Sequence, residues 1–134
     1  MSASAIARAR AGRYRDFELG RGLPAPYRLA FFDRCSSSEW QLRPEIRQMV
    51  TLEQLNLLEP WPGMGCADVI FMRNVLVYFD IATKRALLAR LRGRLHRDGV
   101  LFLGGAETPV NIDDQLVADG AAGRSRFYRV RRPD

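Results

Sequence analysis

Two short apolar runs flank a helical pattern in the second half of the chain. Val69–Met72 and Val100–Leu103 are apolar at every position, which is typical of strands covered on both faces in a parallel sheet. Between them, the residues from Ile81 to Leu95 place their leucines on one helical face, and Asp80 is well suited to cap the first turn. Asp98-Gly99 then predicts a turn between helix and second strand. The order strand, helix, strand predicts a right-handed βαβ unit.

The remaining segments carry weaker patterns. Residues 3–20 show a ragged helical pattern, Gly and Pro residues follow it, and a second helical piece is predicted from about Pro26 to Arg34. The composition of Glu39–Arg43 and of Met49–Gln54 favours strands, so residues 39–54 are expected to hold a small β-hairpin or strand region. Near the end of the chain, Arg126–Val130 is interpreted as a closing antiparallel strand at the edge of the sheet.

Polar residues interrupt the apolar pattern directly after the first predicted strand. Arg73 and Asn74 follow Met72, and the chain is then apolar again up to Phe79, with Tyr78 in this second run. In open α/β sheets, polar groups at the carboxyl end of a strand face the ligand crevice. Arg73, Asn74 and Tyr78 are therefore the first functional candidates. The alternative is that Arg73 and Asn74 only form a turn.

Length and composition narrow the class of protein. A chain of 134 residues is long enough for one domain with a core. No apolar run approaches the roughly 20 residues of a membrane helix, and the first residues lack the apolar segment of a secretory signal. One His and two distant Cys residues make a metal site improbable. A cytoplasmic α/β protein without membrane insertion is the simplest expectation.

The net charge of +6 raises the question of an acidic partner or nucleic acid. The positive charge comes almost entirely from Arg, however, and these residues are scattered through the chain rather than gathered in one patch. No aromatic residues alternate with base-reading side chains as in an RNA-binding sheet. No nucleic-acid partner is therefore expected, and a basic nucleic-acid binder remains only a third hypothesis.

Several motifs, taken in chain order, together resemble one known family. They are Arg-Ala-Gly-Arg-Tyr at 10–14, Gly-Leu-Pro at 22–24, Trp-Gln-Leu-Arg-Pro-Glu-Ile-Arg at 40–47, Asn-Leu-Leu at 56–58, Arg-Asn-Val-Leu-Val-Tyr-Phe-Asp at 73–80 and Asp-Gly-Val-Leu-Phe-Leu-Gly at 98–104. This set resembles the carboxyl-terminal half of the CheR-type chemotaxis protein-glutamate O-methyltransferases. Those enzymes transfer a methyl group from S-adenosylmethionine to glutamate side chains of chemoreceptors.

The resemblance implies a fold and a set of partners. Residues 1–134 would form a single partial domain, the C-terminal part of a Rossmann-like S-adenosylmethionine-dependent methyltransferase sheet whose first two strands are missing. The strand at Val69–Met72 would then be an open apolar edge, a strong template for pairing. We therefore expect self-association, or a partner that supplies the missing strands, in addition to the cytoplasmic region of a chemoreceptor. The isolated chain is expected to be inactive.

The resemblance also implies roles for individual residues. Asn56 and Leu57 match a pair that lines the adenosine end of the cofactor, and Arg73 and Asn74 match a pair that contacts the cofactor. Tyr78 matches a tyrosine near the transferred methyl group, so Arg73 and Tyr78 are the catalytic candidates. From the residues alone, Asn56 starting a turn, Leu57 lying in the core and Tyr78 packing under the helix are equally open.

Some features depart from the family pattern. The chain has no Gly-rich turn followed by a helix, the element that lets the backbone approach a nucleotide cofactor. Met72 stands where the family commonly has Cys, and Gly105-Ala106-Glu107 stands where it has a His-Ser-Glu-type run. These departures support an alternative function, in which the chain is a truncated, non-catalytic interaction module of the same fold.

Overall fold

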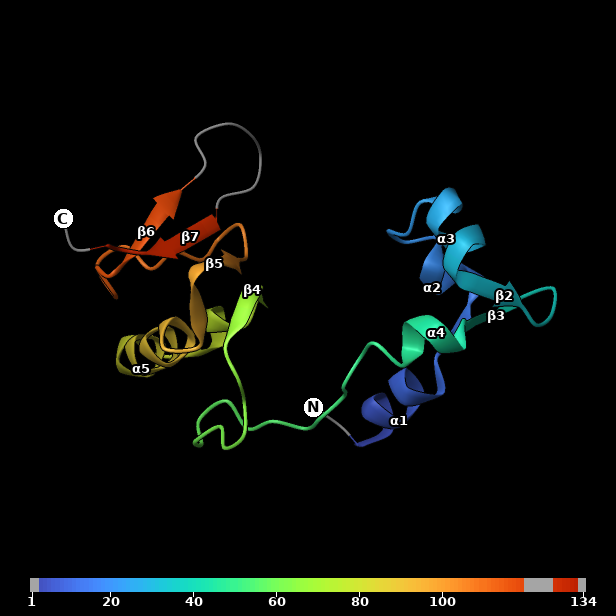
Figure 1. Cartoon of the computed structure of the whole chain (residues 1–134), viewed down its shortest axis with the longest axis horizontal. Helices are drawn as coiled ribbons and strands as arrows, with labels where there is room; N and C mark the ends of the chain where they lie inside the picture. The colour runs from blue at the N-terminus through green and yellow to red at the C-terminus, as the bar shows by residue number, and fades with distance from the viewer. Residues whose placement is uncertain (1–2, 120–126, 133–134) are drawn as a thin grey trace. The chain divides into compact units, whose positions relative to one another are not determined.

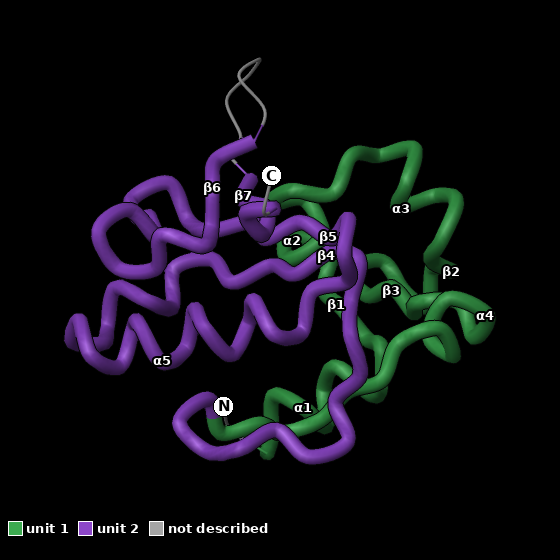
Figure 2. The backbone as a smooth tube through the Cα atoms, turned by 60° about the vertical axis from the view of Figure 1, so that its left-hand side comes forward, with its two compact units in different colours: residues 1–56 green, residues 57–134 purple. Residues whose placement is uncertain are grey.

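The computed structural model describes residues 3–119 and 127–132. The chain divides into two compact units, residues 1–56 and residues 57–134, which are described separately (Figures 1 and 2). Whether both belong to the single partial domain expected from the sequence stays a prediction.

A three-stranded antiparallel sheet forms the centre of the first unit. Its strand order is β1-β3-β2, and short helices precede and follow the strands (Figure 1). The elements are α1 (Ala3–Ala11), β1 (Arg13–Arg15), α2 (Asp16–Leu19), α3 (Ala25–Phe31), β2 (Phe32–Arg34), β3 (Glu39–Leu42) and α4 (Pro44–Arg47). β1 and β2 have only three residues each, which explains why they are hidden in the helical patterns of the first 34 residues.

Trp40 on the central strand β3 organises the packing of this unit. Its side chain is buried, and its indole Nε1 donates a hydrogen bond of 2.8 Å to Asp16 Oδ1. The guanidinium of Arg28 lies over the indole ring, 4.9 Å from its centre, and donates to the same Asp16 oxygen at 3.1 Å. One carboxylate therefore joins the start of α2, the helix α3 and the middle of the sheet.

The expectation of a strand at Met49–Gln54 is wrong. This segment has no regular secondary structure, and β3 pairs with β1 and β2 instead. The amides of Met49 and Val50 donate to the carbonyls of Ile46 and Arg47, continuing the turn that follows α4. The side chains of Met49 and Val50 are 80% and 52% exposed. A composition that favours a strand does not produce one where no partner strand and no buried face are available.

The second unit has a four-stranded mixed sheet in the order β4-β5-β7-β6 (Figure 1). β4 and β5 are parallel, whereas β5–β7 and β7–β6 are antiparallel pairs. The elements are β4 (Ala67–Met72), the short 3-10 helix η1 (Leu76–Tyr78), α5 (Ile81–Arg92), β5 (Leu95–Leu103), β6 (Leu116–Asp119) and β7 (Phe127–Val130). The predicted order strand, helix, parallel strand is thus found in β4, α5 and β5, and the fold is mixed α/β.

The helix α5 begins where the sequence predicts and ends earlier than predicted. Asp80 Oδ1 accepts a hydrogen bond of 2.7 Å from the Thr83 amide, which caps the first turn. Its leucines supply much of the core, which includes Leu87, Leu88 and Leu91 from α5 and Leu101 and Leu103 from β5. The helix stops at Arg92, and Leu95 already belongs to β5.

The turn expected at Asp98-Gly99 is an irregularity within β5 instead. Leu95 pairs with Ala67 and Val100 with Val69, so β5 advances five residues (95 to 100) where β4 advances two (67 to 69). Gly99 permits this local crowding, because a Cβ atom there would lie 2.9 Å from the Ala67 carbonyl oxygen. An Asp-Gly pair favours a tight local bend, and a strand can accommodate that bend as a bulge.

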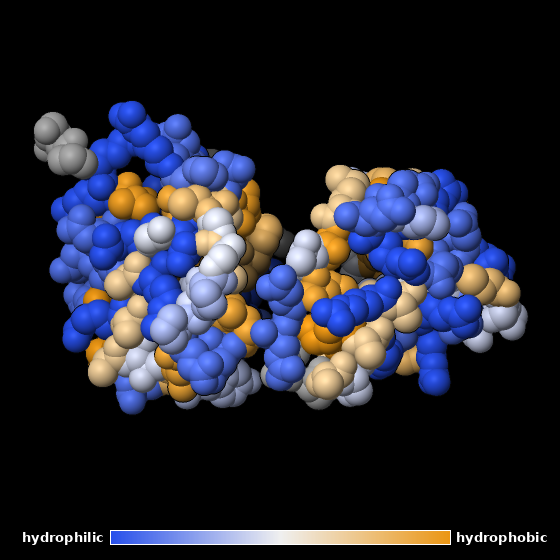
Figure 3. Space-filling view, turned by 60° about the horizontal axis from the view of Figure 1, so that its bottom comes forward, coloured by the Kyte–Doolittle hydropathy of each residue, from blue (hydrophilic) through white to orange (hydrophobic). Residues whose placement is uncertain are grey.

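One of the two edge strands of this sheet differs from the sequence prediction. β7 contains the closing strand predicted at Arg126–Val130, but it lies inside the sheet, and β6 forms the edge that the sequence did not reveal. Arg126 itself lies outside the described residues. The other edge is β4, where Val69 is 47% and Phe71 70% exposed. Figure 3 shows hydrophobic side chains at the surface of each unit among the polar ones.

Leu88 provides a test of the core of the second unit. Its side chain is completely buried, so Leu88→Ala removes apolar contacts and leaves a cavity, at a cost of about 2–5 kcal/mol in the free energy of unfolding. Urea denaturation of the chain measures this loss. The matched control is Leu58→Ala, because Leu58 is 57% exposed and its truncation should change stability by less than about 0.5 kcal/mol. Equal losses in both variants would contradict this description of the core.

Candidate functional site

The carboxyl ends of β4 and β5 meet around the buried carboxylate of Glu107. Because the two strands are parallel and adjacent, the segments that follow them leave from the same end of the sheet. The amide of Asn74, just after β4, donates to Glu107 Oε2 at 2.8 Å, and the amide of Val75 donates to Oε1 at 2.8 Å. Glu107 follows β5 by four residues. One side chain thus connects the two strand ends.

Two further backbone amides complete the surroundings of this carboxylate. Gly104 donates to Oε2 at 2.6 Å and Val77 to Oε1 at 3.3 Å. Burial of Glu107, which is 8% exposed, raises the pKa of its carboxyl group. The backbone hydrogen bonds from Gly104, Asn74 and Val75 lower the pKa by more, so it lies below its ordinary value of 4.5. Glu107 is therefore ionised at neutral pH.

The turn after β4 depends on two special backbone positions. Asn74 has φ of 59°, in the left-handed region that Asn adopts more readily than most residues. Across from it, a Cβ atom at Gly104 would lie 2.5 Å from Asn74 Oδ1 and 2.6 Å from Glu107 Oε2. Only a residue without a side chain allows this approach. Asn74 does form a turn, as the alternative interpretation held, and the same turn determines how its neighbours are presented.

Arg73 and Tyr78 lie on either side of this turn with their side chains in solvent. Tyr78, in η1, is 82% exposed, and Arg73 is also exposed. The alternative that Tyr78 packs under the helix is therefore wrong. Among the residues that the structure describes, neither side chain has a hydrogen bond or an ion pair. Leu76, between them, is buried and anchors the segment to the core. The structure thus brings Arg73, Asn74 and Tyr78 together on one firmly held segment.

The other predicted pair lies at the boundary between the two units. Asn56 is exposed and belongs to the first unit, so its contribution to the site stays a prediction. Leu57 is half-buried and opens the second unit. Its carbonyl accepts a hydrogen bond of 2.7 Å from Arg90 Nη1, which donates equally to the carbonyl of Glu59. The guanidinium of Arg90 also lies over the ring of the buried Trp61. Leu57 is therefore fastened to α5.

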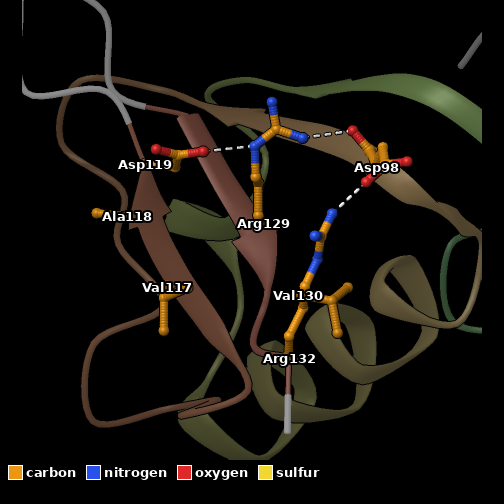
Figure 4. A pocket seen from close by; sticks show the side chains of 7 residues that line it. All are labelled: Asp98, Val117, Ala118, Asp119, Arg129, Val130 and Arg132. Atoms are coloured by element: carbon orange, nitrogen blue, oxygen red, sulfur yellow. Dashed lines mark hydrogen bonds and ion pairs between the residues drawn. The ribbon is translucent and has the colours of Figure 1, made fainter. Parts of the chain in front are cut away.

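A separate surface cavity of about 670 Å³ lies over β6 and β7 and contains none of the predicted residues (Figure 4). Its lining is Asp98, Val117, Ala118, Asp119, Arg129, Val130 and Arg132. Arg129 pairs with Asp119 at 2.5 Å, and Arg132 pairs with Asp98. Each guanidinium thus already has a carboxylate partner. The first pair joins β7 to β6, and the second joins the residues after β7 to the irregular part of β5.

Two other kinds of site are absent from the described part of the chain. It contains no group of three or more His, Cys, Asp or Glu side chains that could hold a metal ion. None of its helices is long and apolar enough to cross a bilayer.

Gly104 and Gly105 give a matched test of the turn. A methyl group at Gly104 collides with Asn74 and Glu107, whereas one at Gly105 meets no atom within 4 Å. We expect Gly104→Ala to lower the free energy of unfolding by about 1–3 kcal/mol and to shift the NMR signals of the Asn74 and Val75 amides. Gly105→Ala should leave both unchanged. The described geometry is wrong if Gly104→Ala is tolerated as well as its neighbour.

Sequence comparisons place this chain in a family. Residues 1–120 match the model of the CheR methyltransferase, SAM binding domain. The chain is 41% identical over 115 residues to chemotaxis protein methyltransferase 1 of Pseudomonas aeruginosa. The aligned residues cover 85% of this chain and 42% of that protein. It is 33% identical over 116 residues to the chemotaxis protein methyltransferase of Vibrio parahaemolyticus, covering 87% of this chain and 42% of the relative.

A third relative carries a different name. The probable biofilm formation methyltransferase WspC of Pseudomonas putida is 37% identical over 89 residues, which are 65% of this chain and 21% of that protein. The chain thus spans well under half the length of these relatives. Because the match to the family model extends over residues 1–120, the chain belongs to the CheR methyltransferase family and to its S-adenosylmethionine-binding domain.

Proposed function

We propose that this chain is the carboxyl-terminal part of a methyltransferase that methylates glutamate side chains of chemoreceptors with S-adenosylmethionine. The observation that supports it best is the segment from Arg73 to Tyr78, whose backbone is fixed while its polar side chains face solvent. In this proposal the mixed sheet of the second unit is part of a Rossmann-like sheet. Its first two strands would come from outside residues 1–134 and pair with β4.

The donor groups of the segment fit the cofactor of the family. S-adenosylmethionine carries a carboxylate, an amino group and ribose hydroxyls, and it supplies a methyl group that is activated by a sulfonium. The unpaired guanidinium of Arg73 is suited to a carboxylate, which it can hold bidentately. The side-chain amide of Asn74 offers a further polar contact, and Asn56 and Leu57 would line the adenosine end of the cofactor in this proposal.

The reaction asks mainly for positioning from the protein. A glutamate carboxylate is already ionised at neutral pH, so no general base is required. Arg73 would hold the carboxylate of the cofactor or of the substrate glutamate, and the exposed Tyr78 hydroxyl would orient the attacking oxygen. Correct alignment of two bound reactants supplies a large part of the rate in such displacements. Arg73 and Tyr78 are therefore the proposed catalytic residues.

The arrangement of the arginines argues against nucleic acid as a partner. Many of them bind within the chain: every ion pair among the described residues contains an Arg. Arg90 and Arg94 bind backbone carbonyls instead. Much of the positive charge is thus engaged in the fold rather than displayed as a phosphate-binding surface. We place the complete protein in the cytoplasm, where it would reach the cytoplasmic region of a chemoreceptor.

Arg73→Ala in the complete enzyme that contains this chain tests the proposed role. We expect a loss in kcat/KM that corresponds to about 2–5 kcal/mol, because a carboxylate in the closed site loses its partner. The melting temperature should be unchanged, since the exposed side chain contributes nothing to the core. Arg97→Ala, at an exposed position of β5, is the control and should retain full activity. If Arg73→Ala lowers stability but leaves turnover per folded molecule unchanged, Arg73 has a structural role.

Residues 1–134 alone should self-associate through the edge of β4. Val69 and Phe71 on this edge are 47% and 70% exposed, and an open apolar edge favours pairing with another strand. Gel filtration with light scattering should show species larger than the 15.2 kDa monomer. Val69→Lys should shift the chain toward monomer, whereas Val110→Lys, at a position 63% exposed away from this edge, should not. A compact monomer in the unmodified chain would contradict the open edge.

The alternative function is a truncated and non-catalytic interaction module, which an activity measurement distinguishes from a methyltransferase. The observation behind it is that Met72 and Gly105-Ala106-Glu107 depart from the pattern that the family commonly shows. Methyl transfer to a chemoreceptor fragment by the complete protein supports the enzyme. Receptor binding without any methyl transfer supports the module.

A further inference from the structure

We propose that Glu107 is a positioning residue for methyl transfer, because its buried carboxylate holds the backbone of the segment that presents Arg73 and Tyr78. This inference rests on the function proposed above for that segment. Glu107 itself would touch neither cofactor nor substrate. It would act through the backbone of the residues between the two catalytic candidates.

The first argument is the distribution of the hydrogen bonds. Each carboxylate oxygen accepts two backbone amides, Gly104 and Asn74 at Oε2 and Val75 and Val77 at Oε1. Three of the four donors lie between Arg73 and Tyr78 in the chain. The fourth, Gly104, lies at the end of the neighbouring parallel strand. The segment is therefore held directly against the carboxyl end of β5, at the end of the sheet where the candidate site lies.

The second argument concerns charge. Within the described residues, Glu107 has no ion-pair partner, and its negative charge is met by backbone N–H dipoles. If Glu107 were paired with Arg73, the guanidinium would be neutralised before any ligand arrived. Because the carboxylate binds only the backbone of the segment, the Arg73 side chain keeps its full charge for a carboxylate outside this chain.

The third argument is that an uncharged side chain could not replace this carboxylate. Four converging N–H donors need acceptors with several lone pairs, and an ionised carboxylate offers two oxygens without a donor. A Gln side chain at the same place offers one oxygen, and its amide hydrogens face two of the N–H groups. At 8% exposure, water has little access to compensate.

The second buried carboxylate of this unit provides a matched control. Asp113 is also 8% exposed. Its Oδ2 accepts from Arg92 Nε at 3.2 Å, and its Oδ1 accepts from the Gln115 amide at 3.0 Å. Within the described residues, it has no hydrogen bond or ion pair with the segment from Arg73 to Tyr78. Asp113→Asn and Glu107→Gln therefore make the same chemical change at two buried sites, only one of which holds that segment.

The first experiment measures how well the backbone amides of the segment are protected from hydrogen exchange, and it needs no activity assay. In Glu107→Gln, the new NH₂ group replaces one of the two carboxylate oxygens, so the two amides that bind that oxygen each lose a hydrogen bond. Amide hydrogen exchange in residues 1–134 should therefore be about tenfold faster either at Gly104 and Asn74 or at Val75 and Val77. Amides in the middle of α5 should exchange as in the unmodified chain. Asp113→Asn should not accelerate exchange at Asn74, Val75 or Val77. Unchanged exchange at these amides in Glu107→Gln overturns the proposal.

The second experiment measures methyl transfer in the complete enzyme. Glu107→Gln should lower kcat by at least about tenfold with a small change in the KM of the receptor substrate, and Glu107→Asp, which keeps the charge, should recover part of the loss. Asp113→Asn at equal folded fraction should retain kcat. If exchange is faster in Glu107→Gln but kcat is unchanged, Glu107 only shapes the loop and the positioning role is wrong. If the unmodified enzyme transfers no methyl group to any receptor fragment, the proposed function is refuted, and the positioning role with it. The exchange experiment still tests whether Glu107 holds the segment.

Discussion

A buried negative charge is unfavourable unless hydrogen bonds compensate for the water that it loses. In the second unit this requirement is met by four backbone amides around Glu107, and much of the local architecture follows from it. β4 and β5 must be parallel so that their ends meet. The chain after β4 must reverse at Asn74 so that successive amides point inward, and position 104 must lack a side chain. Each of these features would be unremarkable alone, and the carboxylate connects them.

The elements that the sequence reveals are those whose signal is local. Val69–Met72 and Val100–Leu103 are recognisable because an uninterrupted apolar run has few other uses in a soluble domain, and Asp80 because a cap acts within one turn. Arg73, Asn74 and Tyr78 stand out because polar residues are unexpected directly after an uninterrupted apolar run. Glu107 does not stand out, because three of its four partners lie 30 to 33 residues away and all four are backbone groups, which no residue type encodes.

The errors have a common physical cause as well. Met49–Gln54 has the composition of a strand but no neighbour to pair with, whereas β1 and β2 form from three residues each because β3 lies between them. Pairing is decided by what the rest of the chain brings alongside. The early end of α5 is similar: Leu95 fits the helical pattern, yet its pairing with Ala67 places it in β5. Local preference was overruled by tertiary contact in each case.

The near absence of lysine has a consequence for how the second unit responds to its surroundings. Arg90 in α5 uses one nitrogen to bind two carbonyls, and Arg94, in the short connection after α5, donates to the Trp61 carbonyl. Guanidinium groups thus fasten the segment before β4 to α5 and to the connection that follows it. A guanidinium stays protonated well above any pH at which proteins are stable, and lysine acetyltransferases do not modify it. These fastenings are therefore insensitive both to alkaline conditions and to the acylation that would neutralise a lysine in their place.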